Sequence, residues 1–260
     1  MTAAIPGTRL SLVVPCYNEA SRLRTDAFRR FAGEHPETSF LFVDDGSRDG
    51  TSARLQELVE ASSSRQFRVL SMERNQGKAE AVRRGVLAAL AERPAFIGYW
   101  DADLATPLEE LPRFVDVLAR HPELDLVLGA RVRMLGRSIE RSGVRHYLGR
   151  VFATVASWAL ELPVYDTQCG SKLFRVDDDL EKLFACPFLS RWVFDVELLA
   201  RLGQVRRESG RPPPEACVYE LPLDSWRDEP GSKVRPFDFV RGLRDVLRLR
   251  RAYRRPAESQ

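Results

Sequence analysis

The sequence has little cysteine and little histidine, four and three residues respectively in a chain of 260. No two of the cysteines form a C-x-x-C pair, so a zinc site is not expected. We expect the four cysteines to be reduced thiols in a cytosolic protein. The amino-terminal residues also lack a charged segment that leads into a long apolar run, so no signal peptide is predicted. These features argue against a disulfide-rich secreted protein and against a zinc enzyme.

Long hydrophobic runs are missing as well. The longest apolar stretch, residues 151–160, is bounded by Arg150 and Glu161 and is far shorter than the roughly 20 residues that a membrane-spanning helix needs. The charge balance is also close to neutral, since 40 Lys and Arg residues face 37 Asp and Glu residues. A net charge of +3 is too small to indicate nucleic-acid binding, although basic residues crowd two stretches, 131–150 and 235–255.

The first half of the chain alternates short apolar runs with helical patterns. The runs predict strands at residues 10–14, 40–43, 67–70, 96–100 and 125–129, and the patterns between them predict helices at residues 19–31, 52–61, 78–91 and 108–119. Thr51 is expected to cap the second helix, and Thr106 with Pro107 to cap and begin the fourth. This alternation predicts an α/β fold with a mostly parallel central sheet, covered by helices on both faces.

The second half is less regular. It predicts helices at residues 142–160, 190–202 with Ser190 as the N-cap, and 237–253, and short strands at residues 169–174 and 217–221. Neither an internal repeat nor a clear linker interrupts the chain. We therefore expect one compact domain over residues 1–260, with a donor half at about 8–132, an acceptor half at about 133–235 and a basic amphipathic helix at about 236–255.

Polar side chains gather where the predicted strands end, which is where ligands bind in such sheets. Asp101 and Asp103 follow a buried strand and lie one residue apart. If the chain bends there, both carboxylates can face one hard cation such as Mg²⁺ or Mn²⁺, which takes oxygen ligands and bridges to substrate phosphates. An ordinary acidic turn is the alternative interpretation of this pair on its own.

Three further segments could form parts of a nucleotide site. A turn between a strand and a helix accounts for Gly46 and Gly50, but it does not require both Asp44 and Asp45, whose charges repel. One of these carboxylates could accept hydrogen bonds from a base N–H or a ribose hydroxyl. The segment 15–19 could form a wall around the base and ribose, and the turn 75–78 contains a glycine that permits close backbone approach.

In this order and spacing, the segments 13–19, 43–47, 75–78 and 101–103 resemble the family-2 glycosyltransferases with the GT-A fold. Further segments resemble the branch of that family that contains the dolichyl-phosphate β-glucosyltransferases and mannose synthases, namely residues 129–131, 166–172, 191–197, Trp226 and 231–234. The resemblance covers about residues 8–240. It implies inverting transfer of a hexose from a nucleotide-sugar to a polyprenyl or dolichyl phosphate, with Mg²⁺ or Mn²⁺ as the cofactor.

The resemblance also implies roles for individual residues. Those expected to contact the nucleoside and its phosphates are Pro15, Tyr17, Glu19, Asp44, Asp45, Lys78, Asp101 and Lys233. Asp101 and Asp103 would hold the metal, Arg131 and Arg145 would receive the lipid phosphate, and the sugar pocket would be lined by Gln168, Trp192 and Asp195. The residues expected to act in the chemical step are Asp103, Arg131 and Asp166. An ionised phosphate acceptor needs guanidinium clamps more than a general base, and Asp166 is the residue to test if a base exists.

The donor and the acceptor each leave alternatives open. Mannosyl relatives often have a Gln two residues after the second metal-binding Asp, whereas this chain has Ala105, which favours UDP-glucose over GDP-mannose. The alternatives are a polyprenyl-phosphate mannosyltransferase that uses GDP-mannose, a soluble glycosyltransferase with a non-lipid acceptor, and a non-catalytic binding protein for nucleic acid or anionic lipid. Carboxylates at every strand end oppose the last, and no nucleic-acid partner is expected.

The carboxyl-terminal helix combines apolar and basic faces. Arginines surround an apolar set at helical spacing, which consists of Phe239, Val240, Leu243, Val246 and Leu247. Such a helix suits an anionic membrane surface, and packing against the protein core is the equal alternative. We therefore expect a cytoplasmic protein that associates peripherally with the cytoplasmic face of a membrane. The sequence does not indicate an oligomeric state.

Overall fold

The computed structural model describes residues 9–62, 65–140, 143–228 and 236–253, and only the helical backbone of residues 144–146, 236–238 and 240. Its strands are β1 (Leu10–Cys16), β2 (Thr38–Asp44), β3 (Phe67–Ser71), β4 (Phe96–Trp100), β5 (Leu126–Ala130), β6 (Ser138–Glu140), β7 (Ser171–Arg175), β8 (Val218–Pro222) and β9 (Ser225–Arg227). Its α-helices are α1 (Thr25–Glu34), α2 (Thr51–Glu60), α3 (Lys78–Leu90), α4 (Leu111–Arg120), α5 (Gly143–Leu160), α6 (Asp178–Ala185), α7 (Phe194–Glu208) and α8 (Pro236–Tyr253). Two short 3₁₀ helices, η1 (Leu108–Glu110) and η2 (Pro214–Ala216), complete the described elements.

Seven strands form the central sheet in the order β3-β2-β1-β4-β7-β5-β8. Strand β7 runs antiparallel to both of its neighbours, whereas the other pairs are parallel, so the predicted mostly parallel sheet is confirmed. Because β7 is reversed, its first residue, Ser171, pairs with Trp100 at the end of β4. The segment that precedes β7 therefore lies at the carboxyl edge of β4, beside Asp101.

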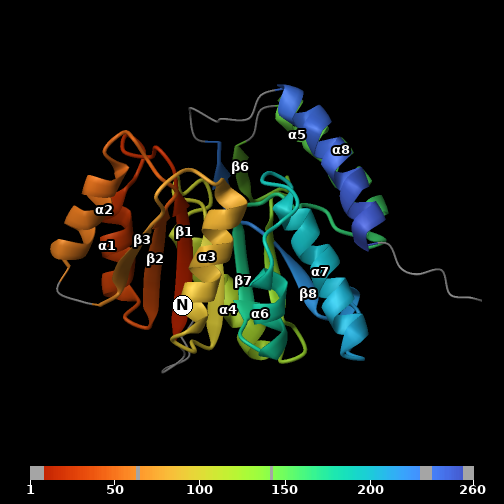
Figure 1. Ribbon diagram of the computed structural model, residues 1–260, viewed down its shortest axis with the longest axis horizontal. Helices are drawn as coiled ribbons and strands as arrows, with labels where there is room; N and C mark the ends of the chain where they lie inside the picture. Colours follow the sequence, from red (N-terminus) through yellow and green to blue (C-terminus); the bar gives the residue numbers. More distant parts are fainter. Residues whose placement is uncertain (1–8, 63–64, 141–142, 229–235, 254–260) are drawn as a thin grey trace, which may run out of the picture.

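Helices cover both faces of this sheet (Figure 1). One core cluster packs α1, α2 and α4 against the sheet, and in it Phe28 of α1 meets Phe40 and Phe42 of β2 edge to face. A second cluster packs α3, α6 and α7 against the opposite face. Apolar side chains on both sides explain why the strands read as continuous hydrophobic runs instead of alternating ones.

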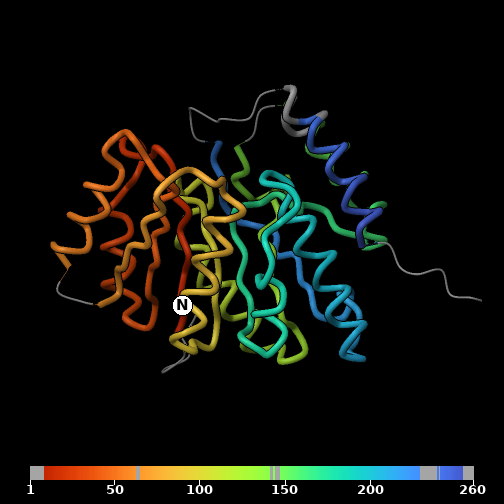
Figure 2. The backbone as a smooth tube through the Cα atoms, in the orientation of Figure 1, coloured from red at the N-terminus to blue at the C-terminus, as the bar shows by residue number. Residues whose placement is uncertain are grey.

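Helices α5 and α8 lie side by side and pack against α7 (Figures 1 and 2). A small separate core joins the three, and it contains Phe152 and Ala156 of α5, Val196 of α7, and Val246 and Leu249 of α8. In the described residues, no helix is both long and apolar enough to cross a bilayer.

Several predicted helix starts are wrong. The first helix begins at Thr25 instead of Glu19, because the carbonyl of Glu19 accepts hydrogen bonds from Arg22 and Leu23 in a separate turn. Thr51 is the first helical residue of α2 and not its cap, since Gly50 precedes it in the left-handed conformation and the Thr51 hydroxyl accepts the Glu19 N–H at 2.8 Å. Both differences arise because the loop after β1 uses the groups that a simple cap would use.

The other two predicted caps are also displaced. The fourth helical region starts as η1, whose preceding residue is Pro107, and the Thr106 carbonyl accepts the indole N–H of Trp100 at 2.7 Å. Helix α7 begins at Phe194, four residues after Ser190, although the Ser190 hydroxyl accepts the backbone N–H groups of Trp192 and Val193 as an N-cap side chain does. Helix α6 and the β6–β9 pair were not predicted from the sequence.

Candidate active site

Asp101 and Asp103 occupy a tight turn directly after β4. The backbone N–H of Asp101 donates to Gly170 O at 3.0 Å, and that of Leu104 donates back to Asp101 O at 3.1 Å. Leu104 has a φ of 53°, a left-handed conformation that is unusual for a buried leucine and costs of order 1 kcal/mol. The Ala105 N–H also donates to Asp103 Oδ1 at 3.1 Å. The bend that would let both carboxylates face one cation is therefore built into the backbone.

Gly170 determines where the Asp101 carboxylate can lie. A Cβ atom added to Gly170 would overlap the side-chain carboxylate of Asp101. Only a glycine leaves this space, because the overlap is with a carboxylate that the reversed strand β7 brings against it. The loop of residues 166–170 and the turn of residues 101–104 are therefore one structural unit.

The two carboxylates have the electrostatics of a cation site. Burial and the neighbouring charge of Asp101 raise the pKa of Asp103 to about 6. In the part of the chain that the structure describes, no group of three or more Asp, Glu, His or Cys side chains is arranged to hold a metal. Two carboxylates fit an ion such as Mg²⁺ or Mn²⁺, which completes its coordination with waters and substrate phosphates.

Lys78 supplies the nearest described positive charge. Its Nζ lies 2.5 Å from Asp101 Oδ1, and the residue begins α3 directly after Gly77, which has a φ of 96°. Burial lowers the pKa of Lys78, but Asp101, Asp195 and Asp103 together raise it above its ordinary value. The ammonium group therefore stays charged across the physiological range, beside the expected position of the diphosphate.

Asp44 and Asp45 organise the neighbouring loops. Asp45 accepts hydrogen bonds at 2.7 Å from the backbone N–H groups of Gln76 and Gly77 and at 2.8 Å from the side-chain amide of Asn75. Asp44 accepts the Ser47 N–H at 3.0 Å and the Ser52 hydroxyl. Burial raises the pKa of Asp45 in spite of its backbone partners. A loop-building role thus explains why both carboxylates are present, and their contact with a nucleoside stays a prediction.

The segment after β1 reaches the same edge of the sheet. Asn18 adopts a φ of 51°. Its backbone N–H donates to Ser47 Oγ at 3.0 Å, and its side-chain oxygen accepts the Arg48 N–H at 2.9 Å. Glu19 pairs with Arg22 at 2.7 Å. The structure thus places the predicted residues Pro15, Tyr17 and Glu19 beside the loop that follows β2.

Arg131 and Asp166 form a buried bidentate ion pair. Arg131 Nε and Nη2 lie 2.7 and 2.8 Å from the two Asp166 oxygens, and the Arg131 backbone N–H donates to Asp166 at 3.1 Å. Burial works against the charge of Arg131, but Asp166 raises its pKa above the ordinary value. Asp166 also accepts the Gln168 N–H at 3.2 Å. The geometry therefore favours Asp166 as the residue that orients Arg131.

A second buried ion pair supports the same loop. Lys172 is fully buried, and its Nζ donates to Asp195 at 2.6 Å and to the carbonyls of Thr167 and Cys169 at 3.0 and 2.7 Å. Asp195 further accepts from the Tyr99 hydroxyl and, at 3.4 Å, from the Gln168 amide. The structure therefore brings Gln168 and Asp195 together, as expected, but Lys172 occupies one Asp195 oxygen.

Trp192 is placed differently from the rest of the predicted sugar pocket. Its ring meets Phe152 of α5 at 6.1 Å, edge to face, and a Cβ atom on Gly242 of α8 would overlap it. The indole therefore packs between the two peripheral helices. The side chain of Arg145 and the whole of Lys233 lie outside the described residues.

Sequence reasoning missed two arginines that border this site. The charge of Arg22 lowers the pKa of Asp103, and that of Arg191 lowers the pKa of Asp45. Arg191 immediately precedes Trp192 in a segment that the sequence did single out. Its position in that segment was the available signal, but the contact with a loop more than a hundred residues earlier depends on the fold.

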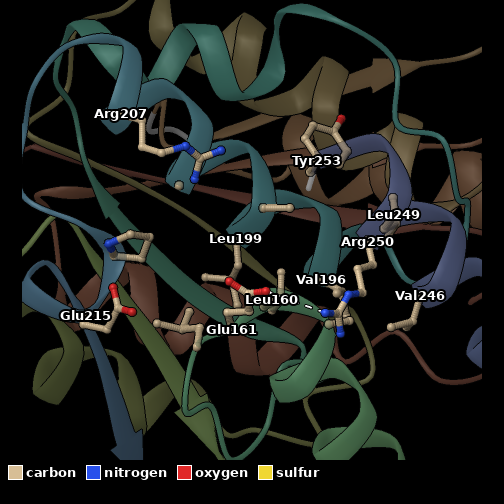
Figure 3. A pocket seen from close by; sticks show the side chains of 15 residues that line it. Leu160, Glu161, Val196, Leu199, Arg207, Glu215, Val246, Leu249, Arg250 and Tyr253 are labelled. Atoms are coloured by element: carbon tan, nitrogen blue, oxygen red, sulfur yellow. Dashed lines mark ion pairs between the residues drawn. The ribbon is translucent and has the colours of Figure 1, made fainter. Parts of the chain in front are cut away.

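A pocket also lies among α5, α7, α8 and η2 (Figure 3). Apolar side chains form much of its wall, and Arg250 pairs with Glu161 at 3.7 Å across one side. None of the predicted site residues lines it. We therefore assign the chemistry to the carboxyl edge of the sheet and not to this pocket.

Comparison with known proteins agrees with that assignment. The family described as "Glycosyl transferase family 2" matches residues 11–181, which include β1, the Asp101–Asp103 turn and the loop before β7. This match covers more than half of the chain.

Curated relatives are similar over nearly the whole chain. The dolichyl-phosphate beta-glucosyltransferase of Mus musculus is 32% identical over 264 residues, which is 95% of this chain and 76% of that protein. Its namesake from Dictyostelium discoideum is 30% identical over 257 residues, covering 94% of this chain and 74% of the relative. That from Homo sapiens is 30% identical over 266 residues, with 95% and 76% covered.

Solved structures share the fold at lower identity. Glucosyl-3-phosphoglycerate synthase from Mycobacterium tuberculosis has a TM-score of 0.64 and 19% identity, with 95% of this chain and 81% of that chain covered. The same synthase in complex with Mn²⁺ and UDP-glucose has a TM-score of 0.62 and 20% identity, with 95% and 79% covered. The predicted GT-A arrangement is thereby confirmed.

Proposed function

This chain belongs to glycosyltransferase family 2, and we propose that it transfers a glucosyl residue from UDP-glucose to a polyprenyl phosphate such as dolichyl phosphate, with inversion. The similarity to dolichyl-phosphate beta-glucosyltransferases along nearly the whole chain supports this acceptor and this sugar. A small residue at Ala105 is consistent with the same branch.

One observation carries the proposal above the others. The loop of residues 166–170 holds Arg131 through Asp166 at its start and backs the Asp101 carboxylate through Gly170 at its end. A guanidinium suited to a phosphate acceptor and a carboxylate pair suited to a metal–diphosphate complex are therefore fixed by one short segment. Such rigid mutual placement is what a displacement between two bound phosphate compounds requires.

The chemical step follows from this arrangement. An oxygen of the acceptor phosphate attacks the anomeric carbon of glucose, and the bond from that carbon to the UDP oxygen breaks, so that UDP leaves with the bonding electrons. The attacking oxygen is already ionised, so no proton has to be removed. Arg131 orients the acceptor through its remaining N–H groups, Asp166 fixes the plane of that guanidinium, and Lys78 counters the charge of the diphosphate.

Asp101 and Asp103 would hold Mg²⁺ or Mn²⁺ in this proposal. When bound, the ion neutralises charge that develops on the departing diphosphate. The raised pKa of Asp103 and the two-carboxylate donor set support a site that is completed by substrate oxygens. The division of the chain into a donor half and an acceptor half is proposed on the same ground.

Association with an anionic membrane surface is the second part of the proposal, and exposed apolar residues on both α5 and α8 support it. On α8, Val246 and Leu249 are buried in the small core with α5 and α7, so part of the predicted apolar stripe packs inward. Leu247 of α8 is 45% exposed, and the exposed residues of α5 include Tyr147, Val151 and Trp158, at 74%, 52% and 56%. Arg250 of α8 stacks over Trp158 at 3.6 Å, next to these apolar groups.

The direct test is an assay with a panel of UDP- and GDP-sugars and a polyprenyl phosphate in detergent, with Mn²⁺ or Mg²⁺. We expect a glucolipid from UDP-glucose and none when Asp103 is replaced by alanine. Product from GDP-mannose, or only with a water-soluble acceptor, would contradict the proposal.

A further inference from the structure

Arg191 is an exposed cation at the edge of the site, and its charge acts on the Asp45 carboxylate. The residue lies between α6 and α7, and within the described ranges its side chain makes neither a hydrogen bond nor an ion pair. The other cations of the site differ, because Lys78 pairs with Asp101 and Arg131 pairs with Asp166. An arginine that the fold places here without such an ion pair has its full set of donors available to a ligand.

The stem of Arg191 lies directly on the donor loop. The ideal Cβ position of Gly77 is 3.3 to 3.4 Å from three side-chain carbons of Arg191, and Gly77 has a φ of 96°. A side chain at position 77 would therefore push the arginine away. Since Gly77 is followed by Lys78, whose ammonium reaches Asp101, the guanidinium of Arg191 lies close to the expected path of the diphosphate.

The backbone on either side of Arg191 is held in place. The Ser190 hydroxyl accepts the N–H groups of Trp192 and Val193 at 3.3 and 3.2 Å and donates to Asp245 of α8 at 2.8 Å. The ring of Trp192 packs on Phe152 and on Gly242. The residues beside Arg191 are thus held in place, while its guanidinium has no hydrogen-bond partner among the described residues. This arrangement suits a side chain that is positioned for a ligand.

The local charges indicate what kind of ligand this is. The carboxylate of Asp45, whose pKa the charge of Arg191 lowers, already accepts three hydrogen bonds from residues 75–77. A guanidinium beside a glycine turn and a lysine matches the paired oxygens of a phosphate group better than a neutral sugar or base. Arg131 is fixed to the loop before β7, on the acceptor side, whereas Arg191 contacts the donor loop.

We propose that Arg191 binds the diphosphate of the nucleotide-sugar donor and stabilises it as it departs. This inference deepens the proposed function and rests on it. It adds to Lys78 a second cation for the leaving group, supplied by the segment before α7. Because Ser190 and Trp192 contact α8, the same segment connects the diphosphate site to the peripheral pair of helices.

The test measures nucleotide binding apart from catalysis. Titration calorimetry with UDP and Mn²⁺ is expected to show an affinity about 10- to 100-fold lower for Arg191→Gln, the usual effect of losing a charge-assisted hydrogen bond to phosphate. Binding of uridine, which has no phosphate, should not change. Arg191→Lys should recover part of the UDP affinity, and kcat/KM for UDP-glucose should fall while the KM for polyprenyl phosphate stays constant.

Arg120→Gln is the matched control, because Arg120 is an exposed arginine on α4 that pairs with Asp116 of the same helix. It should leave UDP affinity unchanged, and circular dichroism should show that all variants are folded. Wild-type UDP affinity in Arg191→Gln would overturn the inference. An effect confined to the KM of polyprenyl phosphate would overturn it too, by assigning Arg191 to the acceptor. Failure of the wild-type protein to bind UDP would instead sink the proposed function.

Discussion

Arg131 and Asp166 meet side by side, with Nε and Nη2 of the arginine 2.7 and 2.8 Å from the two carboxylate oxygens. Both side chains are largely buried, at 12% and 9% exposure, so the pair is rigid and only weakly screened by water. Arg131 directly follows strand β5 and Asp166 begins the loop before β7, so the pair joins the end of β5 to the segment that backs Asp101. In the proposed function, this pair orients the acceptor.

Replacing Asp166 by asparagine therefore tests an orienting role against a basic one. We expect kcat/KM for the acceptor to fall about a hundredfold, or roughly 2.7 kcal/mol, because one half of the bidentate contact is lost. The pH profile of the residual activity should keep the wild-type shape. Loss of its acidic limb in Asp166→Asn would instead identify Asp166 as a general base.

Gly170→Ala should impair the predicted metal site without replacing a charged residue. The added Cβ would overlap the Asp101 carboxylate, so we expect weaker Mn²⁺ binding and at least a tenfold loss of transfer. The matched control is Gly33→Ala in α1, where nothing lies within 4 Å of the added atom. That control should keep full activity. Equal behaviour of the two variants would show that the Gly170–Asp101 contact is not needed.

The raised pKa of Asp103 predicts a trade between stability and function. A carboxyl group whose pKa rises from 3.8 to about 6 on folding stabilises the protein fully below pH 3.8, and that contribution is lost as the pH rises through about 6. In EDTA at pH 7.5, Asp103→Asn should therefore be more stable than the wild type by roughly 1–3 kcal/mol. The difference should shrink near pH 4, and the variant should be inactive.

Thermal unfolding at the two pH values measures this effect. For the same reason, the affinity of the wild-type protein for Mn²⁺ should fall below about pH 6, where Asp103 becomes protonated. If Asp103→Asn is less stable than the wild type at pH 7.5, the ionised Asp103 carboxylate does not lower the free energy of unfolding.

Membrane association should depend on the exposed face of α5. Tyr147→Ser combined with Val151→Ser removes two exposed apolar side chains, and we expect binding to anionic liposomes to fall several-fold in sedimentation assays. Binding of the wild type should weaken as salt rises. Tyr219→Ser is the control, because Tyr219 is 42% exposed on β8, outside the α5–α8 pair. Unchanged binding of the double variant would remove α5 from the membrane surface.

Much of the fold could be predicted because buried strands leave an unambiguous pattern. All five apolar runs of the first half became strands, and Asp101 and Asp103 lie at the carboxyl edge where the pattern placed them. Helix starts were less predictable. The Thr51 hydroxyl accepts the N–H of Glu19 in another loop, and α7 begins only at Phe194, four residues after Ser190. The reversal of β7 has no local signature, and it alone brings Gly170 against Asp101.

The candidate site was predicted in its residue types more fully than in its contacts. The sequence indicated that Asp45 and Asp166 matter, but not that Asp45 holds the loop 75–77 or that Asp166 holds Arg131. Those partners lie about thirty or more residues away, so only the folded chain identifies them. Arg191 was overlooked for the same reason, because its neighbour Gly77 belongs to the other half of the chain.

The most direct test of the central claim is single-turnover transfer with UDP-glucose and polyprenyl phosphate, compared between the wild type, Asp103→Ala and Arg131→Lys. We expect a β-linked glucosyl phosphate lipid from the wild type. We expect no product from Asp103→Ala, and a large loss in Arg131→Lys that is concentrated in the KM of the lipid, since lysine cannot make the bidentate contact. Full transfer by Asp103→Ala, or wild-type protein that leaves polyprenyl phosphate unmodified with every donor, would contradict the central claim.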